Sequence, residues 1–296
     1  RVLKKENPDV VMTHNLKGIG YLIPRATMNL KIKHVHTLHD IQLLHPSGLM
    51  LYGKEKTVNG VFSKFYQFMC RRLFGSPDAV ISPSKWLLEE HIGRGFFKDS
   101  KKVVLPNPMG IMNHESGIRN QGERIFKFLY VGLIEKHKGI LFLINAFNNW
   151  DAPADIGVGG FELLIVGDGS KLKQAQELAG ENKNIKLLGR IKNDEAVELM
   201  RSSDCLIMPS LCYENSPTVI YEAMASGLPV IASRIGGVPE LVDDNLLFKP
   251  GDEKDLMVKI EWALKNKDKI KKMAASRQKE INEFKDENYI KRLMEL

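Results

Sequence analysis

The sequence predicts an α/β protein with two doubly wound parallel-sheet domains. Short apolar runs alternate with amphipathic helical stretches along most of the 296 residues, and strands separated by helices form parallel sheets with helices on both faces. The predicted strands are almost wholly apolar, as strands buried on both faces should be. A polar, turn-rich stretch at 109–123 interrupts the alternation before it restarts, so we expect the domains to divide there.

The first domain is expected over residues 1–120. The chain opens like the end of a helix, followed by a turn at Asn7-Pro8-Asp9. A domain rarely starts in this way, so we expect that an upstream segment is missing. Ser84 suits the start of a helix, and apolar residues recur at helical spacing through 58–74, at Val61, Phe62, Phe65, Phe68, Met69 and Leu73. The expected strands are 10–13, 33–38, 79–81 and 103–105, and the expected helices are 58–74 and 84–92.

The second domain is expected over residues 121–280, where apolar runs and helical patterns alternate again. Its expected strands are 126–131, 162–166, 185–188, 205–208 and 229–233. Its expected helices are 138–148, 170–179, 194–201, 217–225, a short turn at 239–241 and a long region at 255–284. A last helix at 287–296, within a third segment at 281–296, is expected to pack back on the first domain.

Charge and cysteine content exclude several classes of protein. Residues 1–120 carry 18 lysines and arginines against 9 acidic residues, a net charge of +9, whereas residues 121–296 carry −2. A basic surface attracts phosphates, nucleic acid or anionic lipid, although the charge alone favours an ordinary solvated face. Cys70, Cys205 and Cys212 form no CxxC pair, so we expect buried free thiols in a reducing compartment. We find no signal peptide and no apolar run long enough to span a membrane.

The most informative stretch runs from Asp204 to Glu240. A buried strand ends there at Pro209-Ser210, a loop follows, and Pro217 suits the first turn of a helix. The backbone N–H groups of Thr218 and Val219 would point out of the helix start and form an anion site. Glu214 lies before this helix and Glu222 lies on it, and either carboxylate could accept two hydrogen bonds from a ribose diol or a sugar. Taken alone, a glutamate in such a short motif is most often a solvated surface acid.

This stretch resembles the signature of the retaining glycosyltransferases of family 4, which have the GT-B fold of two Rossmann-like domains facing a cleft. The Glu-x7-Glu pattern of the family matches Glu214 to Glu222, and Ala223-Met-Ala-Ser-Gly-Leu-Pro-Val-Ile-Ala-Ser233 matches in full. Further matches extend over nearly the whole chain. They are Pro8-Asp9-Val10-Val11, Thr37-Leu38-His39-Asp40, Ser82-Pro83-Ser84, Pro106-Asn107-Pro108, Tyr130-Val131-Gly132, Val166-Gly167-Asp168-Gly169, Gly236-Gly237-Val238-Pro239-Glu240 and Phe248-Lys249-Pro250-Gly251-Asp252.

The resemblance implies transfer of a sugar from a nucleotide-sugar donor to an acceptor hydroxyl with retained anomeric configuration. It implies that Glu222 holds the ribose hydroxyls, that Glu214 contacts the transferred sugar, and that His39 faces that sugar. Lys138 would neutralise the leaving diphosphate, where charge develops in the transition state. The other implied donor-binding residues are Gly132, Arg190, Ile191, Asn215, Ser216, Thr218 and Val219. His39 also has a structural interpretation, since His34, His36 and His45 lie near it in the sequence.

Two departures from the family pattern affect these expectations. The family usually has arginine after the glycine at the end of the first strand of the second domain, but Leu133 follows Gly132 here, which leaves Lys138 as the motif's cation. Lys136 or the helix-start amides could compensate, and Lys138 could itself be a solvated helix lysine. The glycine-rich loop that opens the family's first domain is also missing before Asn7, and Gly18-Ile-Gly20 does not replace it.

The remaining expectations concern partners, cofactors and rival functions. We expect a nucleotide-sugar donor, a sugar or lipid-linked acceptor from cell-envelope polysaccharide, lipopolysaccharide or glycolipid synthesis, no metal or other cofactor and no nucleic acid. We expect a cytoplasmic protein, with peripheral contact to the anionic inner face of the plasma membrane as an option that the basic first domain suggests. The alternatives are a catalytically silent glycosyltransferase-like subunit and a sugar-nucleotide epimerase. We discount a dinucleotide-binding oxidoreductase because Gly167-Asp-Gly169 lacks the third glycine of its motif.

Overall fold

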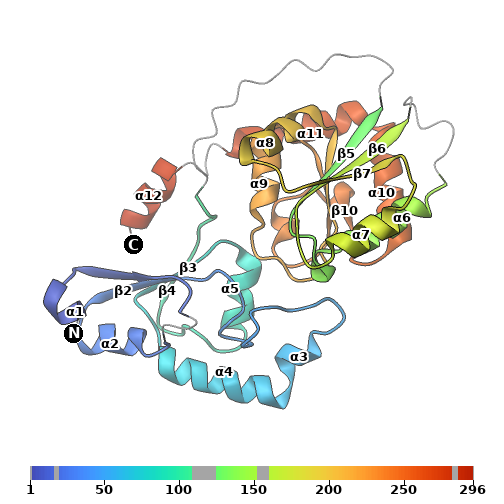
Figure 1. Ribbon diagram of the computed structural model, residues 1–296. Coiled ribbons are helices and arrows are strands. Elements are labelled where there is room, and N and C mark those ends of the chain that lie inside the picture. Colours follow the sequence, from blue (N-terminus) through green and yellow to red (C-terminus); the bar gives the residue numbers. More distant parts are fainter. Residues whose placement is uncertain (1, 17–19, 109–124, 152–159, 282–285, 296) are drawn as a thin grey trace. The chain divides into compact units, whose positions relative to one another are not determined.

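The computed structural model describes residues 2–16, 20–108, 125–151, 160–281 and 286–295, which fall into two compact units (Figure 1). Unit 1 comprises Arg1–Asn107 and Tyr289–Leu296, and unit 2 comprises Pro108–Asn288. Each unit is built on one parallel sheet, which confirms the predicted fold class. The linker expected at 109–123 lies outside the described residues.

Unit 1 contains a four-stranded parallel sheet in the order β1-β2-β3-β4. Because the order follows the chain, each strand and its crossover return beside the strand before it. The strands are β1 (Val10–Thr13), β2 (Lys33–Thr37), β3 (Ala79–Ser82) and β4 (Lys101–Val104). The helices are α1 (Val2–Glu6), α2 (Ile23–Asn29), α3 (Lys56–Asn59), α4 (Val61–Phe74), α5 (Lys85–Ile92) and, at the end of the chain, α12 (Asp286–Met294).

The core of unit 1 is rich in aromatic rings. Phe74 packs edge-on against His36 and Phe97, with ring centroids 4.6 and 5.8 Å apart. Phe97 also stacks on His91, so buried histidines form part of this core. On the small core of β2 and β3, Tyr289 and Leu293 of α12 pack against residues that include Val35 and Ile81.

Helix α4 differs from the expected single helix at 58–74 in two respects. Gly60 separates α3 from α4 with an extended backbone. Most of the apolar positions of α4 also lie on its exposed side, and these are Val61, Phe62, Phe65, Phe68 and Met69. The buried side consists of Ser63, Gln67, Cys70 and Phe74. Burying one Phe side chain stabilises a fold by about 1.5–3 kcal/mol. The exposed phenylalanines of this helix do not contribute that stabilisation to the fold.

Unit 2 contains a six-stranded parallel sheet in the order β10-β9-β8-β5-β6-β7. Its strands are β5 (Phe126–Val131), β6 (Phe161–Val166), β7 (Ile185–Gly189), β8 (Cys205–Met208), β9 (Val230–Ser233) and β10 (Leu247–Phe248). β8 and β9 are buried along their whole length, as expected for central parallel strands. The two-residue strand β10 and helix α2 were not predicted.

Helices cover both faces of this sheet (Figure 1). α6 contacts α7 and α10 in one layer, and α9 contacts α11 in the other. The helices are α6 (Ile140–Asn148), α7 (Leu172–Ala179), α8 (Asn193–Ser202), α9 (Thr218–Ala225), α10 (Glu253–Lys265) and α11 (Lys267–Glu280), with short 3-10 turns η1 (Lys136–Lys138), η2 (Val238–Glu240) and η3 (Asp244–Leu246). The long region expected at 255–284 is thus two helices.

All three cysteines are buried free thiols, as predicted. Among the described helices, none is long and apolar enough to cross a bilayer.

Candidate functional site

The candidate site of unit 2 lies at the carboxyl edge of its sheet. Because all six strands are parallel, the loops after β5, β6, β7, β8 and β9 leave the sheet at one edge. Ligands of open α/β sheets bind at this edge. The residues predicted in unit 2 follow β5, β7 or β8, so the topology brings their loops to one side.

Glu214 lies in the loop after β8 and is held by three side chains. The ammonium Nζ of Lys138 donates a hydrogen bond to its Oε1 at 2.7 Å, and the two form an ion pair. The hydroxyl of Ser210 donates to the same oxygen at 2.7 Å, and the thiol of Cys212 lies 3.6 Å away. Only 13% of the Glu214 side chain is exposed. Burial and the Glu214 charge raise the pKa of Cys212 to about 12, so it remains a neutral donor.

Two glycines let the backbone pack closely around this ion pair. Gly139, just after Lys138, has φ +76°, and a Cβ there would lie 1.8 Å from the carbonyl oxygen of Pro209. Gly236 has φ +59°, and a Cβ there would lie 2.1 Å from the carbonyl oxygen of Glu214. The amide of Gly237 also donates to that carbonyl at 2.8 Å. Lys138 and Glu214 are therefore positioned by backbone contacts that a larger residue would break.

Glu222 lies on α9 and is bound quite differently. Its side chain is half-buried, and this burial raises the pKa of its carboxyl. Within the described residues, its carboxylate has no hydrogen-bond or ion-pair partner. A desolvated carboxylate of this kind gains from any hydroxyl donor that reaches it.

Helix α9 begins one residue later than predicted. Pro217 is its N-cap, with an extended backbone, and Thr218 is the first helical residue. The first N–H groups of a helix have no intrahelical partner, and this helix start therefore offers donors to an anion. Ser216 is buried and its hydroxyl lies 2.6 Å from that of Tyr221, whereas Asn215 is only half-buried.

The loop after β5 carries Gly132 and the departure at Leu133. The Tyr130 hydroxyl donates to the Leu133 carbonyl at 2.7 Å, and the Gly132 amide donates to Val166 at 3.1 Å. A Cβ on Gly167, where φ is +142°, would lie 1.8 Å from the carbonyl oxygen of Gly132. The Leu133 side chain itself is 58% exposed, so an apolar group faces solvent where the family pattern has a cation.

Arg190 and Ile191 follow β7, at the end of the sheet order. Arg190 is exposed, and Ile191 packs against the core of unit 2. β6 separates β7 from β5. The structure thus places these two residues at the carboxyl edge but gives neither of them a contact with Lys138, Glu214 or Glu222.

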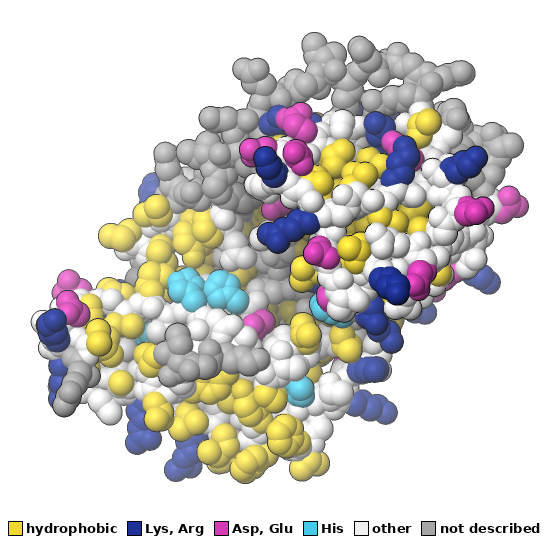
Figure 2. All heavy atoms as spheres, viewed as in Figure 1, with side chains coloured by type: hydrophobic (Ala, Val, Ile, Leu, Met, Phe, Trp, Pro, Cys, Tyr) yellow, Lys and Arg dark blue, Asp and Glu magenta, His cyan; other side chains and the backbone are white. Residues whose placement is uncertain are grey.

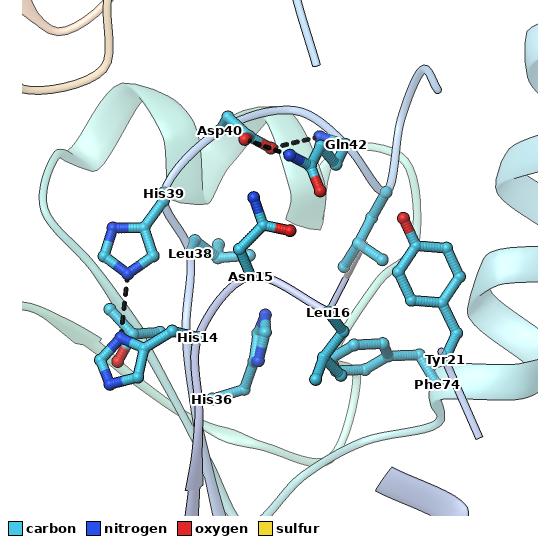
Figure 3. Close-up of a pocket in the computed structure, with 12 residues that line it drawn as sticks. His14, Asn15, Leu16, Tyr21, His36, Leu38, His39, Asp40, Gln42 and Phe74 are labelled. Carbon is cyan, nitrogen blue, oxygen red and sulfur yellow. Dashed lines mark hydrogen bonds between the residues drawn. The ribbon is translucent and has the colours of Figure 1, made fainter. Parts of the chain in front are cut away.

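His39 belongs to unit 1, where it follows β2 and lines a small pocket of about 20 Å³ (Figure 3). Its Nε2 lies 2.9 Å from Nδ1 of His14, and the two rings stack at 5.2 Å. Burial lowers the pKa of His39, and His14 lowers it further. Asn15, Asp40 and Gln42 line the same pocket.

Sequence analysis missed His14 as a partner of His39. The signal was present, because His14 follows β1 and His39 follows β2, and β1 pairs with β2 in parallel register. Ser210 and Cys212 were also missed, and only the fold around Glu214 reveals them.

His34 and His36 lie on one face of β2, as predicted from the alternation. The hydroxyl of Thr13 bridges them, 2.7 Å from His34 Nε2 and 2.8 Å from His36 Nδ1. Both rings are buried, and burial lowers the pKa of each. They are core groups rather than site residues. Over the described part of the chain, no cluster of three or more His, Cys, Asp or Glu side chains could hold a metal ion.

Comparison with known families identifies the two parts of the chain. Residues 1–109 match the family model described as Glycosyltransferase Family 4, and residues 125–266 match the one described as Glycosyl transferases group 1. The chain belongs to the GT-B glycosyltransferases. It is thus an enzyme of the transferase class, and the family suggested by the motif around Glu222 is confirmed at this level.

Individual relatives agree with this assignment. The GT-B chain is 26% identical over 95% of its length to an uncharacterized glycosyltransferase of Methanocaldococcus jannaschii. It is 30% identical over 82% of its length to the putative teichuronic acid biosynthesis glycosyltransferase TuaC of Bacillus subtilis. It spans 72% of the first relative and 58% of the second. Among solved structures, Anabaena HepE in complex with UDP matches 99% of the chain and 79% of its own length, with a TM-score of 0.75 and 20% identity.

Proposed function

We propose that this protein transfers a hexose from a nucleoside diphosphate sugar to an acceptor hydroxyl, with retention of the anomeric configuration. Glu222 accepts hydrogen bonds from the ribose diol, Lys138 and the start of α9 bind the diphosphate, and Glu214 contacts the sugar. The structural relative HepE is known in complex with UDP, which supports a nucleotide-sugar donor. TuaC is described as a putative teichuronic acid biosynthesis glycosyltransferase, which supports an acceptor from cell-envelope polysaccharide synthesis.

The proposed step breaks the bond between the anomeric carbon and the diphosphate oxygen, and the diphosphate leaves with the bonding electrons. The acceptor oxygen forms its bond to the same face of that carbon, and its proton passes to the leaving diphosphate. Charge therefore develops on the diphosphate, where a fixed cation and helix N–H groups are worth the most. The Lys138 ammonium, held 2.7 Å from Glu214, is a fixed cation of this kind.

The observation that carries the proposal is the half-buried carboxylate of Glu222, which lies four residues after the first residue of α9 and has no partner among the described residues. We test it by calorimetric titration of the protein with UDP, GDP, ADP and dTDP. At least one should bind, and Glu222→Gln should weaken that binding about 10- to 100-fold, because hydrogen bonds to charged groups contribute about 1.5–3 kcal/mol each. Glu177→Gln, an exposed carboxylate on α7, is the matched control. Equal affinity of Glu222→Gln and the unaltered protein would refute the assignment.

The exposed Leu133 gives a second candidate function, a silent glycosyltransferase-like subunit. Such a subunit could bind nucleotide yet transfer no sugar, because one of the two usual cations is missing. Incubation with mixed nucleotide sugars and detection of released nucleoside diphosphate separates the two functions. Leu133→Arg should raise the rate of an active enzyme.

We also propose that catalysis needs no metal, because Lys138 and the helix start supply the positive charge. Sugar transfer should therefore persist in EDTA. A rate that falls in EDTA and returns with a divalent cation would contradict this proposal.

We further propose that the protein works at the cytoplasmic face of the membrane on a lipid-linked or otherwise anionic acceptor. The support is the net charge of +9 over residues 1–120, since basic surfaces concentrate anionic partners. Release of the protein from the membrane fraction by salt is the result expected.

A further inference from the structure

The exposed side of α4 is a hydrophobic surface of unit 1 that the proposed donor site does not use. Its residues, here called the α4 face, are Val61, Phe62, Phe65, Phe68 and Met69, and their exposed fractions run from 87% at Val61 to 39% at Met69. Figure 2 shows hydrophobic side chains gathered over this part of the unit. Leu49 and Tyr52, in the segment before α3, are exposed as well. Contiguous apolar patches of this kind mark sites of interaction.

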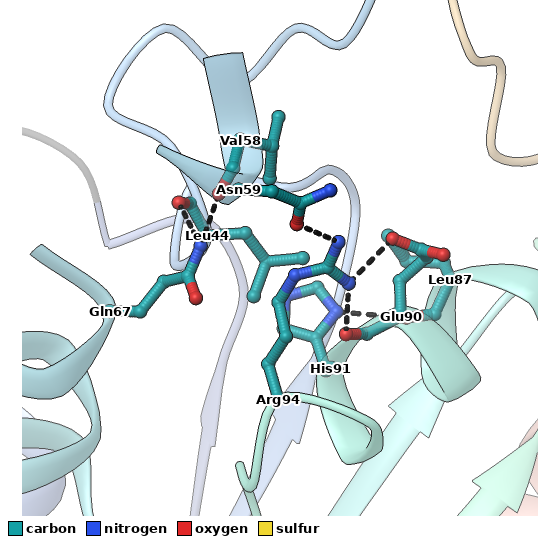
Figure 4. A network of polar contacts seen from close by, with 8 residues as sticks. All are labelled: Leu44, Val58, Asn59, Gln67, Leu87, Glu90, His91 and Arg94. Atoms are coloured by element: carbon teal, nitrogen blue, oxygen red, sulfur yellow. Dashed lines mark hydrogen bonds and ion pairs between the residues drawn. The ribbon is translucent and has the colours of Figure 1, made fainter. Parts of the chain in front are cut away.

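The polar side of α4 fixes this exposure. The amide of Gln67 donates to the carbonyls of Leu44 at 3.0 Å and Val58 at 2.8 Å, and both bonds are buried (Figure 4). Ser63 donates to the carbonyl of Thr57 at 2.6 Å. On the neighbouring element, Arg94 donates to the side chain of Asn59 at the end of α3. The aromatic side is therefore presented by specific bonds and is no accident of loose packing.

The charge around the α4 face is positive. Residues 49–75 contain five basic side chains and one acidic side chain. Lys54, Lys56, Lys64 and Arg72 are all exposed. Helices that lie in the membrane interface combine an aromatic and aliphatic face with flanking lysine and arginine.

We propose that the α4 face docks on a membrane surface of anionic lipids. Phe62, Phe65 and Phe68 enter the boundary between headgroups and acyl chains, and the flanking cations meet lipid phosphates. This inference rests on the proposed membrane contact and names the surface that makes it. A second copy of the chain fits less well, because a two-fold contact through this face would bring two sets of like charges together.

The experiment measures binding of the full chain to vesicles, without nucleotide or acceptor. Phosphatidylcholine vesicles with phosphatidylglycerol should bind the protein at low salt, and phosphatidylcholine alone should bind it far less. The variant Phe62→Ser/Phe65→Ser/Phe68→Ser should lower the partition coefficient about tenfold or more, because each ring removed is buried area lost. Val258→Ser, which removes an exposed apolar side chain from α10 of unit 2, should change nothing.

A second readout follows the face itself. Phe65→Trp should shift its emission to the blue when the anionic vesicles are added, and the shift should weaken in salt. Absence of vesicle binding, or equal binding by the triple variant, would overturn the proposal. So would a dimer in sedimentation velocity that the triple variant converts to monomer without any vesicle binding. Nucleotide titration of the same preparations reports separately on the donor site, so loss of one function is distinguishable from loss of the other.

Discussion

The two units treat their polar groups in opposite ways. In unit 2, Lys138 and Glu214 form a tight ion pair, and the carboxylate of Glu222 has no partner among the residues that the structure describes. In unit 1, the titratable groups of the interior include histidines whose pKa is lowered by burial, among them His36 and His91. The excess positive charge of residues 1–120 is therefore spread over exposed lysines and arginines. The charged groups that form a site lie in unit 2. Unit 2 should be sensitive to changes of charge and loop geometry, and unit 1 to changes of pH.

The largest expected effect is the loss of the Lys138 cation. Lys138→Met should lower kcat for release of nucleoside diphosphate by about 10²- to 10³-fold, the usual loss when one stabilising group is removed from the transition state. Steady-state kinetics checks this. Lys136→Met, in the same turn but exposed, is the control and should change kcat little. If Lys136→Met were the more damaging change, Lys136 would be the phosphate ligand and the charge arrangement of unit 2 would need revision.

The next effect tests the close packing around the ion pair. Gly139→Ala should destabilise the protein by about 2–4 kcal/mol, because the new Cβ would meet the Pro209 carbonyl and φ there is +76°. Gly53→Ala has nearly the same positive φ, +74°, but its Cβ would meet no atom within 4 Å. Its cost should be about 1 kcal/mol. Chemical denaturation measures the loss of unfolding free energy for both variants. Equal losses would show that the loop after β8 shifts easily to make room for the added Cβ.

Acid should act on unit 1 first. Burial lowers the pKa of His91 to about 4 and lowers that of His36 and His34, while unfolded histidine titrates near 6.5. The unfolded chain therefore binds protons first, so stability is full above pH 6.5 and falls as the pH drops from there towards 4. His91 alone should cost about 2 kcal/mol at pH 5, and His36 and His34 should add to this loss.

Hydrogen exchange checks the prediction unit by unit. On lowering the pH from 7 to 5, amides of β2 and β3 should lose protection relative to those of β5 and β8, after correction for intrinsic rates. His45→Gln, outside the buried group, should leave the pH dependence unchanged. Equal loss of protection in both units would contradict the prediction that acid destabilises unit 1 before unit 2.

The smallest effect concerns His14. Because His14 lowers the pKa of His39, though less than burial does, His14→Leu should raise the pKa of His39. Titration of the imidazole C–H signals by NMR measures it, with His45→Gln as the control. A fall in the pKa would mean that the 2.9 Å contact stabilises the charged form of His39 instead.

Much of this fold follows from local pattern. Short apolar runs such as 205–208, which alternate with helical stretches, predict buried parallel strands, and the Glu214–Glu222 signature places a loop and a helix start in order. Two kinds of feature could not be predicted from local pattern. The partners of Glu214, Ser210 and Cys212, depend on how a loop folds on itself, which no periodicity encodes. The orientation of α4 could not be predicted, because periodicity identifies an apolar stripe but does not say which side of the helix packs against the rest of the unit.

The buried bonds of Gln67 have one more consequence. A helix can rotate about its axis if its polar groups find hydrogen-bond partners in both orientations. A rotation of α4 that buried Phe65 would leave the Gln67 side-chain amide without its two carbonyl acceptors. Leaving such a group unsatisfied costs about 1–3 kcal/mol. Gln67 thus acts as a rotational register lock, in the way that a single buried asparagine fixes the register of a coiled coil. The same two hydrogen bonds that tie the helix to Leu44 and to Val58 of α3 keep its hydrophobic side outward.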